Sequence, residues 1–187
     1  MSYKIEALNS SLDKKDFCCG KALLNNYLPK QAGLDIKRKL CVVFALTEGT
    51  TIKEYYSLSN DGIPRDLIPE IIQKKMSPSH QNLPATLLGR QAVDERYNGK
   101  GLGSFLLIDA LRRCFEISTI SIDCMVVITD PTDEKPIAFY LKYGFIKLPD
   151  SGKMFLLMRT EGQLFIGKTF FYKLPGVSII SAMQSYF

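Results

Sequence analysis

Residues 98–104, which read NGKGLGS, combine the features of a phosphate-binding loop. Glycines at positions 99, 101 and 103 let a backbone approach a ligand without obstruction by Cβ atoms. A strand pattern precedes the loop and a helical pattern follows it, so backbone N–H groups and the positive end of a helix dipole converge there. Lys100 adds a mobile positive charge at the rim. These features predict a phosphate or pyrophosphate site, and an ordinary glycine-rich turn is the alternative.

Two well-known phosphate loops do not fit this sequence. A P-loop requires the pattern G-x-x-x-x-G-K-[ST], which no stretch of the chain supplies. The dinucleotide fingerprint G-x-G-x-x-G has a wider final spacing than the G-x-G-x-G of this loop. Neither a P-loop NTPase nor a Rossmann dinucleotide-binding protein is therefore indicated.

A second group of residues that could do chemistry is the aromatic cluster at residues 138–145, AFYLKYGF. Tyr140 offers a phenol whose ordinary pKa of about 10 suits a proton donor. Taken alone, the cluster is typical of a helix end with aromatic packing anchors, and Gly144 is a suitable residue to end that helix. Tyr143 follows Tyr140 by about one helical turn and is expected to pack.

Histidine and cysteine chemistry has little support in this sequence. His80 is the one histidine and lies in the polar segment SPSHQN, so it is expected to be a solvated loop residue. A histidine-based triad or a multi-histidine metal site would have to include it. The five cysteines form no C-x-x-C pair and are expected to be reduced and mostly buried: Cys18, Cys19, Cys41, Cys114 and Cys124. We therefore expect neither a metal site nor a disulfide framework.

The elements that must position these residues follow from hydrophobic periodicity. Strands are predicted at residues 5–8, 40–46, 52–59, 86–93, 120–128, 145–148 and 153–158. Helices are predicted within residues 13–28, from Pro29 to about residue 37, at 65–75, from the glycine loop to about residue 116, and at 134–143. The segment NDGIP at residues 60–64 is expected to end its strand. An early hairpin followed by alternating strands and helices indicates an α/β fold with a mixed sheet.

The helix after the glycine loop has two distinct faces. Its predicted core face carries Leu106, Leu107, Ala110, Leu111 and Cys114. The opposite face, expected to lie in water, carries Asp109, Arg112, Arg113 and Glu116. This pattern predicts a helix packed on a sheet.

Length and composition fit one ordinary globular domain. The chain has 187 residues, of which 46% are hydrophobic and 23% charged, with a net charge of +5. The excess positive charge permits an anionic partner such as CoA or RNA without requiring one. No apolar run has the length of a membrane span, and the N-terminal residues lack the apolar core of a signal peptide. We expect a cytoplasmic protein that does not enter a membrane.

The glycine loop and the aromatic cluster together resemble the GNAT acetyltransferases. Arg96, Gly99 and Gly101 match the fixed positions of the acyl-CoA pyrophosphate loop of that superfamily, [QR]-x-x-G-x-[GA]. Residues 139–145 match its F-Y-x-x-x-G-F signature. The resemblance implies the GNAT fold, a mixed and mostly antiparallel central sheet flanked by helices, and acetyl-CoA as the acetyl donor.

Further segments narrow the resemblance to the GNAT toxins of bacterial toxin-antitoxin modules. These segments are FCCGKALLNNYL, YYSLS, LGRQAVD and MFLLM, and with the two motifs they extend over about residues 13–160. The resemblance implies a toxin that acetylates the α-amino group of aminoacyl-tRNA, with a ribbon-helix-helix antitoxin and a second copy of the chain as candidate partners. It implies a GNAT domain at residues 1–165 and leaves residues 166–187 as an extension of unknown role. The alternatives are acetylation of a small-molecule or protein amine, and a non-catalytic CoA-binding regulatory module.

The resemblance also implies roles for individual residues. Tyr140 would be the general acid that protonates the departing thiolate. Arg90 would either position the acceptor or brace the strand. The implied cofactor-binding residues are Ala92 and Val93 on the central strand and, around the loop, Arg96, Asn98, Gly99, Lys100, Gly101, Leu102, Gly103 and Ser104.

Overall fold

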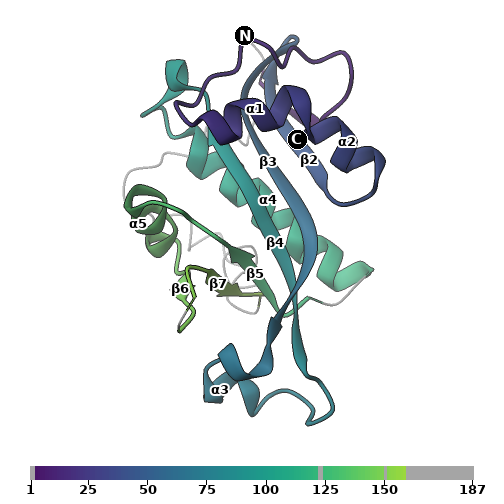
Figure 1. Cartoon of the computed structure of the whole chain (residues 1–187), viewed down its shortest axis with the longest axis vertical. Helices are drawn as coiled ribbons and strands as arrows, with labels where there is room; N and C mark the ends of the chain where they lie inside the picture. Colours follow the sequence, from purple (N-terminus) through teal and green to yellow (C-terminus); the bar gives the residue numbers. More distant parts are fainter. Residues whose placement is uncertain (1–2, 122–123, 150, 159–187) are drawn as a thin grey trace.

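Seven strands form one sheet in the order β1-β2-β3-β4-β5-β7-β6 (Figure 1). The structure is a computed structural model that describes residues 3–121, 124–149 and 151–158. The strands are β1 (Lys4–Ala7), β2 (Val42–Glu48), β3 (Thr51–Pro64), β4 (Asn82–Val93), β5 (Val126–Thr129), β6 (Ile146–Lys147) and β7 (Met154–Leu157). Of the pairs between these strands, β4 with β5 is parallel and the others are antiparallel. The predicted mixed and mostly antiparallel sheet is confirmed.

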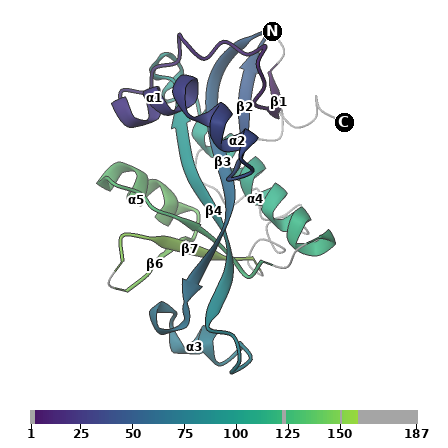
Figure 2. The same cartoon turned by 45° about the vertical axis from the view of Figure 1, so that its right-hand side comes forward.

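Helices cover both faces of the sheet (Figures 1 and 2). Successive side chains of a strand point to opposite faces, so the neighbours Tyr55 and Tyr56 belong to different cores. Tyr55 packs with Tyr27 and Leu28 under α1 (Ala22–Lys30) and α2 (Ala32–Lys37). Tyr56 packs under α4 (Leu102–Ile120) on the other face. The central strands are therefore buried on both sides.

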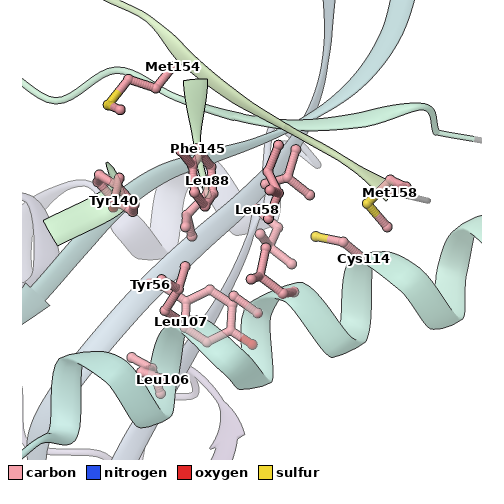
Figure 3. Close-up of a cluster of buried hydrophobic side chains, with 14 of the residues drawn as sticks. Tyr56, Leu58, Leu88, Leu106, Leu107, Cys114, Tyr140, Phe145, Met154 and Met158 are labelled. Carbon is pink, nitrogen blue, oxygen red and sulfur yellow. The ribbon is translucent and has the colours of Figure 1, made fainter. Parts of the chain in front are cut away.

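A hydrophobic core lies between α4 and the sheet and holds the helix in place (Figure 3). The predicted apolar face of the helix is confirmed, with Leu106 and Leu107 fully buried against Leu88 and Leu58 of the sheet. Burial of a leucine side chain contributes about 1.5 to 3 kcal/mol to stability. This packing fixes the first turn of α4 relative to β4.

One residue of the predicted water-facing side of α4 is buried instead. Asp109 is 8% exposed and accepts a hydrogen bond from the Tyr56 hydroxyl at 2.6 Å. Arg113 and Arg112 donate to the same carboxylate at 2.8 and 3.1 Å. The expectation that Asp109 lies in water was wrong, because a carboxylate paired with two guanidinium groups and a phenol can be buried at low cost.

The hairpin of β3 and β4 is longer than the sequence predicted, and it extends away from the rest of the sheet (Figure 2). The segment at residues 60–64 does not end the strand: Gly62 pairs with Pro84 and Ile63 with Leu83. Pairing across the hairpin thus overrides the local turn preference of Asn, Asp and Gly. A 3₁₀ turn (Arg65–Leu67) and the short α3 (Glu70–Gln73) at the tip replace the single helix predicted at 65–75.

The N-terminal helices also differ from expectation. The first helix begins at Ala22 rather than near residue 13, and Pro29 lies inside its last turn instead of separating two helices. Residues before it run past the sheet, where the Cys18 N–H donates to the Asp94 carboxylate. The five cysteines carry free thiols as predicted, although among them Cys114 alone is buried and Cys18 is exposed.

The C-terminal part of the described chain follows the predicted order. α4 continues to Ile120, so β5 is shorter than the strand predicted at 120–128. α5 (Glu134–Lys142) ends before Gly144, whose φ of 83° is the left-handed conformation that glycine favours after a helix. The predicted extension at residues 166–187 lies outside the described residues. No helix in the described ranges is long and apolar enough to cross a membrane.

Candidate active site

The sheet opens between β4 and β5. Within the described residues these strands pair at three positions: Ala85 with Val126, Thr86 with Val127 and Leu87 with Ile128. β4 then continues to Val93, still paired with β3 on its other side. A cavity of about 600 Å³ lies at this divergence, between the first turn of α4 and α5. Its lining includes Lys21, Gln91, Val93, Gly103, Asp133, Pro136, Phe139 and Tyr140.

The glycine loop forms one wall of this cleft. Gly99 and Gly101 have φ of 76° and 77°, and a Cβ atom on either would meet no other atom within 4 Å. The N–H groups of Ser104 and Phe105 both donate to the Gly101 carbonyl, at 3.2 Å each. The N–H groups of Leu102 and Gly103 precede this first bond and have no partner inside the helix. The loop thus presents backbone donors at the positive end of a 19-residue helix, which is an anion-binding arrangement.

Asp94 braces the turn between β4 and the loop. It is fully buried and accepts from the Arg96 guanidinium at 2.7 and 2.8 Å and from the backbone N–H groups of Arg96 and Cys18. Burial alone would raise the pKa of Asp94, but these hydrogen bonds outweigh burial and hold its pKa below the usual value. The structure therefore places the predicted cofactor residue Arg96 in a structural brace, with its side chain half exposed beside the loop.

Positive charge gathers around Tyr97, just before the loop. The ammonium groups of Lys53 and Lys100 lie 4.1 and 4.9 Å from the centre of its ring, and the Lys53 ammonium contacts its hydroxyl. Lys53 is also paired with Glu48 at 2.8 Å, whereas Lys100 is exposed on the loop. Lys100 is thus well placed to meet an anion at the loop.

Tyr140 forms the opposite wall of the cleft, on α5. Its side chain is 6% exposed and packs edge-on against Phe139 and tilted against Phe145, with ring centres 5.3 and 5.1 Å apart. Its hydroxyl donates to the Oε1 atom of Gln91 at 3.1 Å. Burial raises the pKa of Tyr140 to about 12, so the phenol keeps its proton at neutral pH. Tyr143 packs against Phe139, as expected.

The predicted residues of β4 fall on both of its faces. Ala92 is buried in the core under α1, and Val93 lines the cleft. The Arg90 guanidinium stacks 4.0 Å above the ring of Tyr27, and the Arg90 N–H donates to the Ser57 hydroxyl. This contact is the one expected of a strand brace.

Three features in and beside the cleft were not predicted from the sequence. The Gln91 side chain hydrogen-bonds both the Gly103 carbonyl of α4 and the Tyr140 hydroxyl of α5. Lys21 and Asp133 form an ion pair between residues that both line the cleft. Glu54, opposite Val93 on β3, is fully buried. Among the described residues no hydrogen bond of standard geometry reaches its carboxylate oxygens, and the Gln91 amide only partly opposes the effect of burial on its pKa. Burial raises the pKa of Glu54 well above its usual value. A glutamate inside the apolar strand sequence IKEYYSLS was the available signal.

A sheet that splays beside a glycine loop at a helix start, with a buried tyrosine opposite, is the arrangement expected of the acyl-CoA site of a GNAT acetyltransferase. The acetyltransferase (GNAT) family matches residues 78–145. A probable toxin TacT from Sinorhizobium fredii (strain NBRC 101917 / NGR234) is 30% identical over 157 residues, covering 79% of this chain and 86% of that protein. The chain therefore belongs to the GNAT acetyltransferase family.

Its relatives within the family are toxins. A tRNA-acetylating toxin of Mycobacterium tuberculosis (strain ATCC 25618 / H37Rv) is 26% identical over 155 residues, covering 83% of this chain and 91% of that protein. The crystal structure of a tyrosine-to-phenylalanine mutant of KacT superposes with a TM-score of 0.81 at 28% identity, covering 88% of this chain and 100% of that one. AtaT in complex with acetyl-methionyl-tRNAfMet gives a TM-score of 0.81 at 26% identity, covering 88% and 99% of the two chains.

Proposed function

We propose that this protein transfers the acetyl group of acetyl-CoA to the α-amino group of an aminoacyl-tRNA and so acts as a toxin that inhibits translation. The observation that carries the proposal is the cleft itself, in which the buried hydroxyl of Tyr140 faces the first turn of α4 across the gap between β4 and β5. The tRNA-acetylating relatives support the choice of acceptor.

The residues around the loop fit an acyl-CoA. The N–H groups of Leu102 and Gly103 and the ammonium of Lys100 suit its pyrophosphate. The open edge of β4 at Ala92 and Val93 offers backbone groups to its amide-containing arm. When bound, the coenzyme would supply an activated acetyl thioester. An AtaTR structure with acetyl-CoA, 26% identical to this chain, supports the same ligand here.

Tyr140 is proposed to hold and deliver the proton that the departing thiolate requires. With a pKa of about 12 the phenol is fully protonated at neutral pH, and the apolar rings of Phe139 and Phe145 exclude water around it. The phenol therefore enters the reaction with its proton in place, although the raised pKa also makes it a weaker acid in the free protein.

The acceptor amine needs little help from the protein. An α-amino group has a pKa of about 7.7 to 8.0, so a useful fraction is neutral at cellular pH. Arg90 is proposed to brace β4 rather than to bind the acceptor, since its guanidinium is stacked on Tyr27. A net charge of +5 is compatible with an RNA partner. We further propose an antitoxin partner, since KacT has been solved in a KacTA complex with DNA.

Mass spectrometry of charged tRNA, incubated with the protein and acetyl-CoA, tests this function. We expect an acetyl group on the aminoacyl moiety, and Tyr140→Phe should lower the rate by about 10²-fold or more while acetyl-CoA affinity stays nearly unchanged in calorimetry. Tyr143→Phe is the matched control and should keep wild-type turnover, because Tyr143 packs on Phe139.

Three results would contradict parts of the proposal. Wild-type turnover of Tyr140→Phe would remove Tyr140 as the acid. Acetylation of small amines or proteins without acetylation of aminoacyl-tRNA would replace the acceptor. Binding of acetyl-CoA without transfer to any amine would make the protein a non-catalytic binding module.

A further inference from the structure

Gln91 is the side chain that joins the two walls of the cleft. It lies on β4 opposite Tyr56, beyond the last pair that β4 makes with β5. Its Nε2 atom donates to the Gly103 carbonyl in the first turn of α4 at 2.7 Å. Its Oε1 atom accepts from the Tyr140 hydroxyl on α5 at 3.1 Å. One amide therefore connects the proposed coenzyme-binding turn to the proposed acid.

The direction of these two bonds is fixed by chemistry. A carbonyl oxygen can only accept, so the Gln91 nitrogen must face Gly103. The Gln91 oxygen then necessarily faces Tyr140 and can only accept from it. A hydrogen bond of this direction requires the phenol to be protonated and favours that form over the phenolate.

We infer that Gln91 is a positioning residue, which keeps the Tyr140 hydroxyl protonated, in one orientation and in register with the first turn of α4. The inference rests on the proposed function, because it concerns the acid of that reaction. Gln91 would thus support both the proposed acid on α5 and the coenzyme-binding turn of α4. These two helices lie beside different parts of the sheet.

The surroundings of Tyr140 explain why this support matters. Ring contacts with Phe139 and Phe145 fix the plane of the phenol, but they leave its O–H bond free to rotate. The Thr129 side chain also lies within hydrogen-bonding reach of this hydroxyl, but Gln91 is the partner that also contacts the first turn of α4. Loss of the Gln91 amide should therefore disturb the direction of proton delivery and spare the packing of the ring.

The first test is the variant Gln91→Met, which keeps the length of the side chain and removes both hydrogen bonds. We expect kcat to fall by about tenfold, since misorientation of a reacting group costs of that order. KM for acetyl-CoA and the melting temperature should change little. Gln81→Met is the control. Gln81 lies just before β4, is exposed, and its side chain takes part in no hydrogen bond among the described residues.

A double-mutant cycle separates positioning from a general structural effect. If Gln91 acts through Tyr140, then Gln91→Met should lower kcat in the wild-type background and have no further effect in Tyr140→Phe. NMR of protein labelled at the tyrosine Cζ atoms gives a second readout that needs no turnover. The Tyr140 signal, assigned by its loss in Tyr140→Phe, should shift in Gln91→Met while the other tyrosine signals stay in place.

Each contrary outcome has a defined meaning. Unchanged kcat in Gln91→Met, an equal loss of kcat in both backgrounds, or an unshifted Tyr140 signal would overturn the positioning role and leave the proposed function intact. A wild-type protein that transfers no acetyl group would overturn the proposed function and this inference together.

Discussion

Burial favours the protonated forms of two acidic groups beside the cleft. Tyr140 and Glu54 both sit where water is excluded, and burial raises the pKa of each because the charged form loses its hydration. The Tyr140 hydroxyl donates to Gln91, whereas no hydrogen bond of standard geometry reaches the Glu54 carboxylate oxygens among the described residues, and the Gln91 amide only partly opposes the effect of burial there. Burial, which favours the protonated form of Glu54, also disfavours negative charge beside Val93 and the coenzyme-binding turn.

Glu54→Gln should stabilise the protein, and increasingly so as pH rises. The folded state keeps the Glu54 proton at pH values where the unfolded chain has released it, above a pKa of about 4.3. The wild-type side chain is therefore best tolerated below that pH, and its contribution to stability is lost as pH rises toward the folded-state pKa. We expect the variant to be more stable at pH 7, because glutamine takes up no proton on folding, with the difference growing by up to about 1.4 kcal/mol per pH unit above the unfolded-state pKa.

Urea denaturation at several pH values between 4 and 9 measures this difference. Glu70→Gln is the matched control, since the Glu70 side chain is 87% exposed on α3. The control should show no growing difference with pH. A constant or shrinking difference for Glu54→Gln would mean that Glu54 is ionised in the folded protein.

At the scale of elements, the start of α4 needs a glycine in the left-handed conformation and places the positive end of a helix dipole in the cleft. Gly101 takes a left-handed conformation, and the helix that follows it is anchored by Leu106 and Leu107. The strong dipole of this helix therefore acts at a fixed point of the cleft. A negative charge placed in its first turn should compete with the pyrophosphate of a coenzyme.

Gly103→Asp should abolish acetyl-CoA binding without unfolding the protein. A Cβ atom at Gly103 would make only an ordinary contact, 3.5 Å from Val93, so the loss would arise from charge repulsion and obstruction of the site. Gly33→Asp is the matched control, because Gly33 is also the second residue of a helix and its Cβ would meet no atom within 4 Å. Calorimetry should show wild-type affinity for the control and none for Gly103→Asp. Equal affinity in both variants would contradict the loop assignment.

The sequence predicted those elements whose signals are local. The glycine loop, the apolar face of α4 and the end of α5 at Gly144 depend on residues within a few turns of one another, and all were found where expected. The extension of β3 through residues 60–64 could not be foreseen, because its stabilising partner is β4, about twenty residues away. Long-range pairing of this kind leaves no trace in the local pattern.

The same limit applies to the site. Tyr140 and the loop were proposed from their motifs, and those roles remain predictions. The bridge through Gln91 and the burial of Asp109 and Glu54 depend on neighbours from distant elements. A glutamine in a strand gives no indication of which helices its amide will meet.

At the scale of the whole molecule, the cleft divides the sheet into two parts. Strands β1 to β4 carry α1, α2 and α4, whereas β5, β7 and β6 lie beyond the divergence with α5 beside them (Figures 1 and 2). A bound coenzyme would contact both parts, since the loop belongs to the first and Tyr140 to the second. Occupation of the cleft should therefore stabilise the whole fold rather than one element.

Acetyl-CoA should raise the free energy of unfolding in the wild-type protein. At a free concentration of 100 times Kd, the expected gain is about 2.7 kcal/mol if the unfolded chain does not bind the ligand. Urea denaturation with and without acetyl-CoA measures this gain, and Gly103→Asp should show none. An equal gain in Gly103→Asp would place the binding site elsewhere.

The opening between β4 and β5 also bears on how the protein avoids unwanted association. A strand edge at the rim of a sheet is a template for pairing with other chains, and proteins protect such edges with charges, bulges or covering loops. Here the unpaired stretch of β4 lies in the interior of the sheet, flanked by α4 and α5. Because β4 and β5 still pair over part of their length and helices stand on both sides, another chain has less access to this edge than to an edge at the rim. The backbone edge that would favour aggregation at the rim is thus kept for a ligand that fits the cleft.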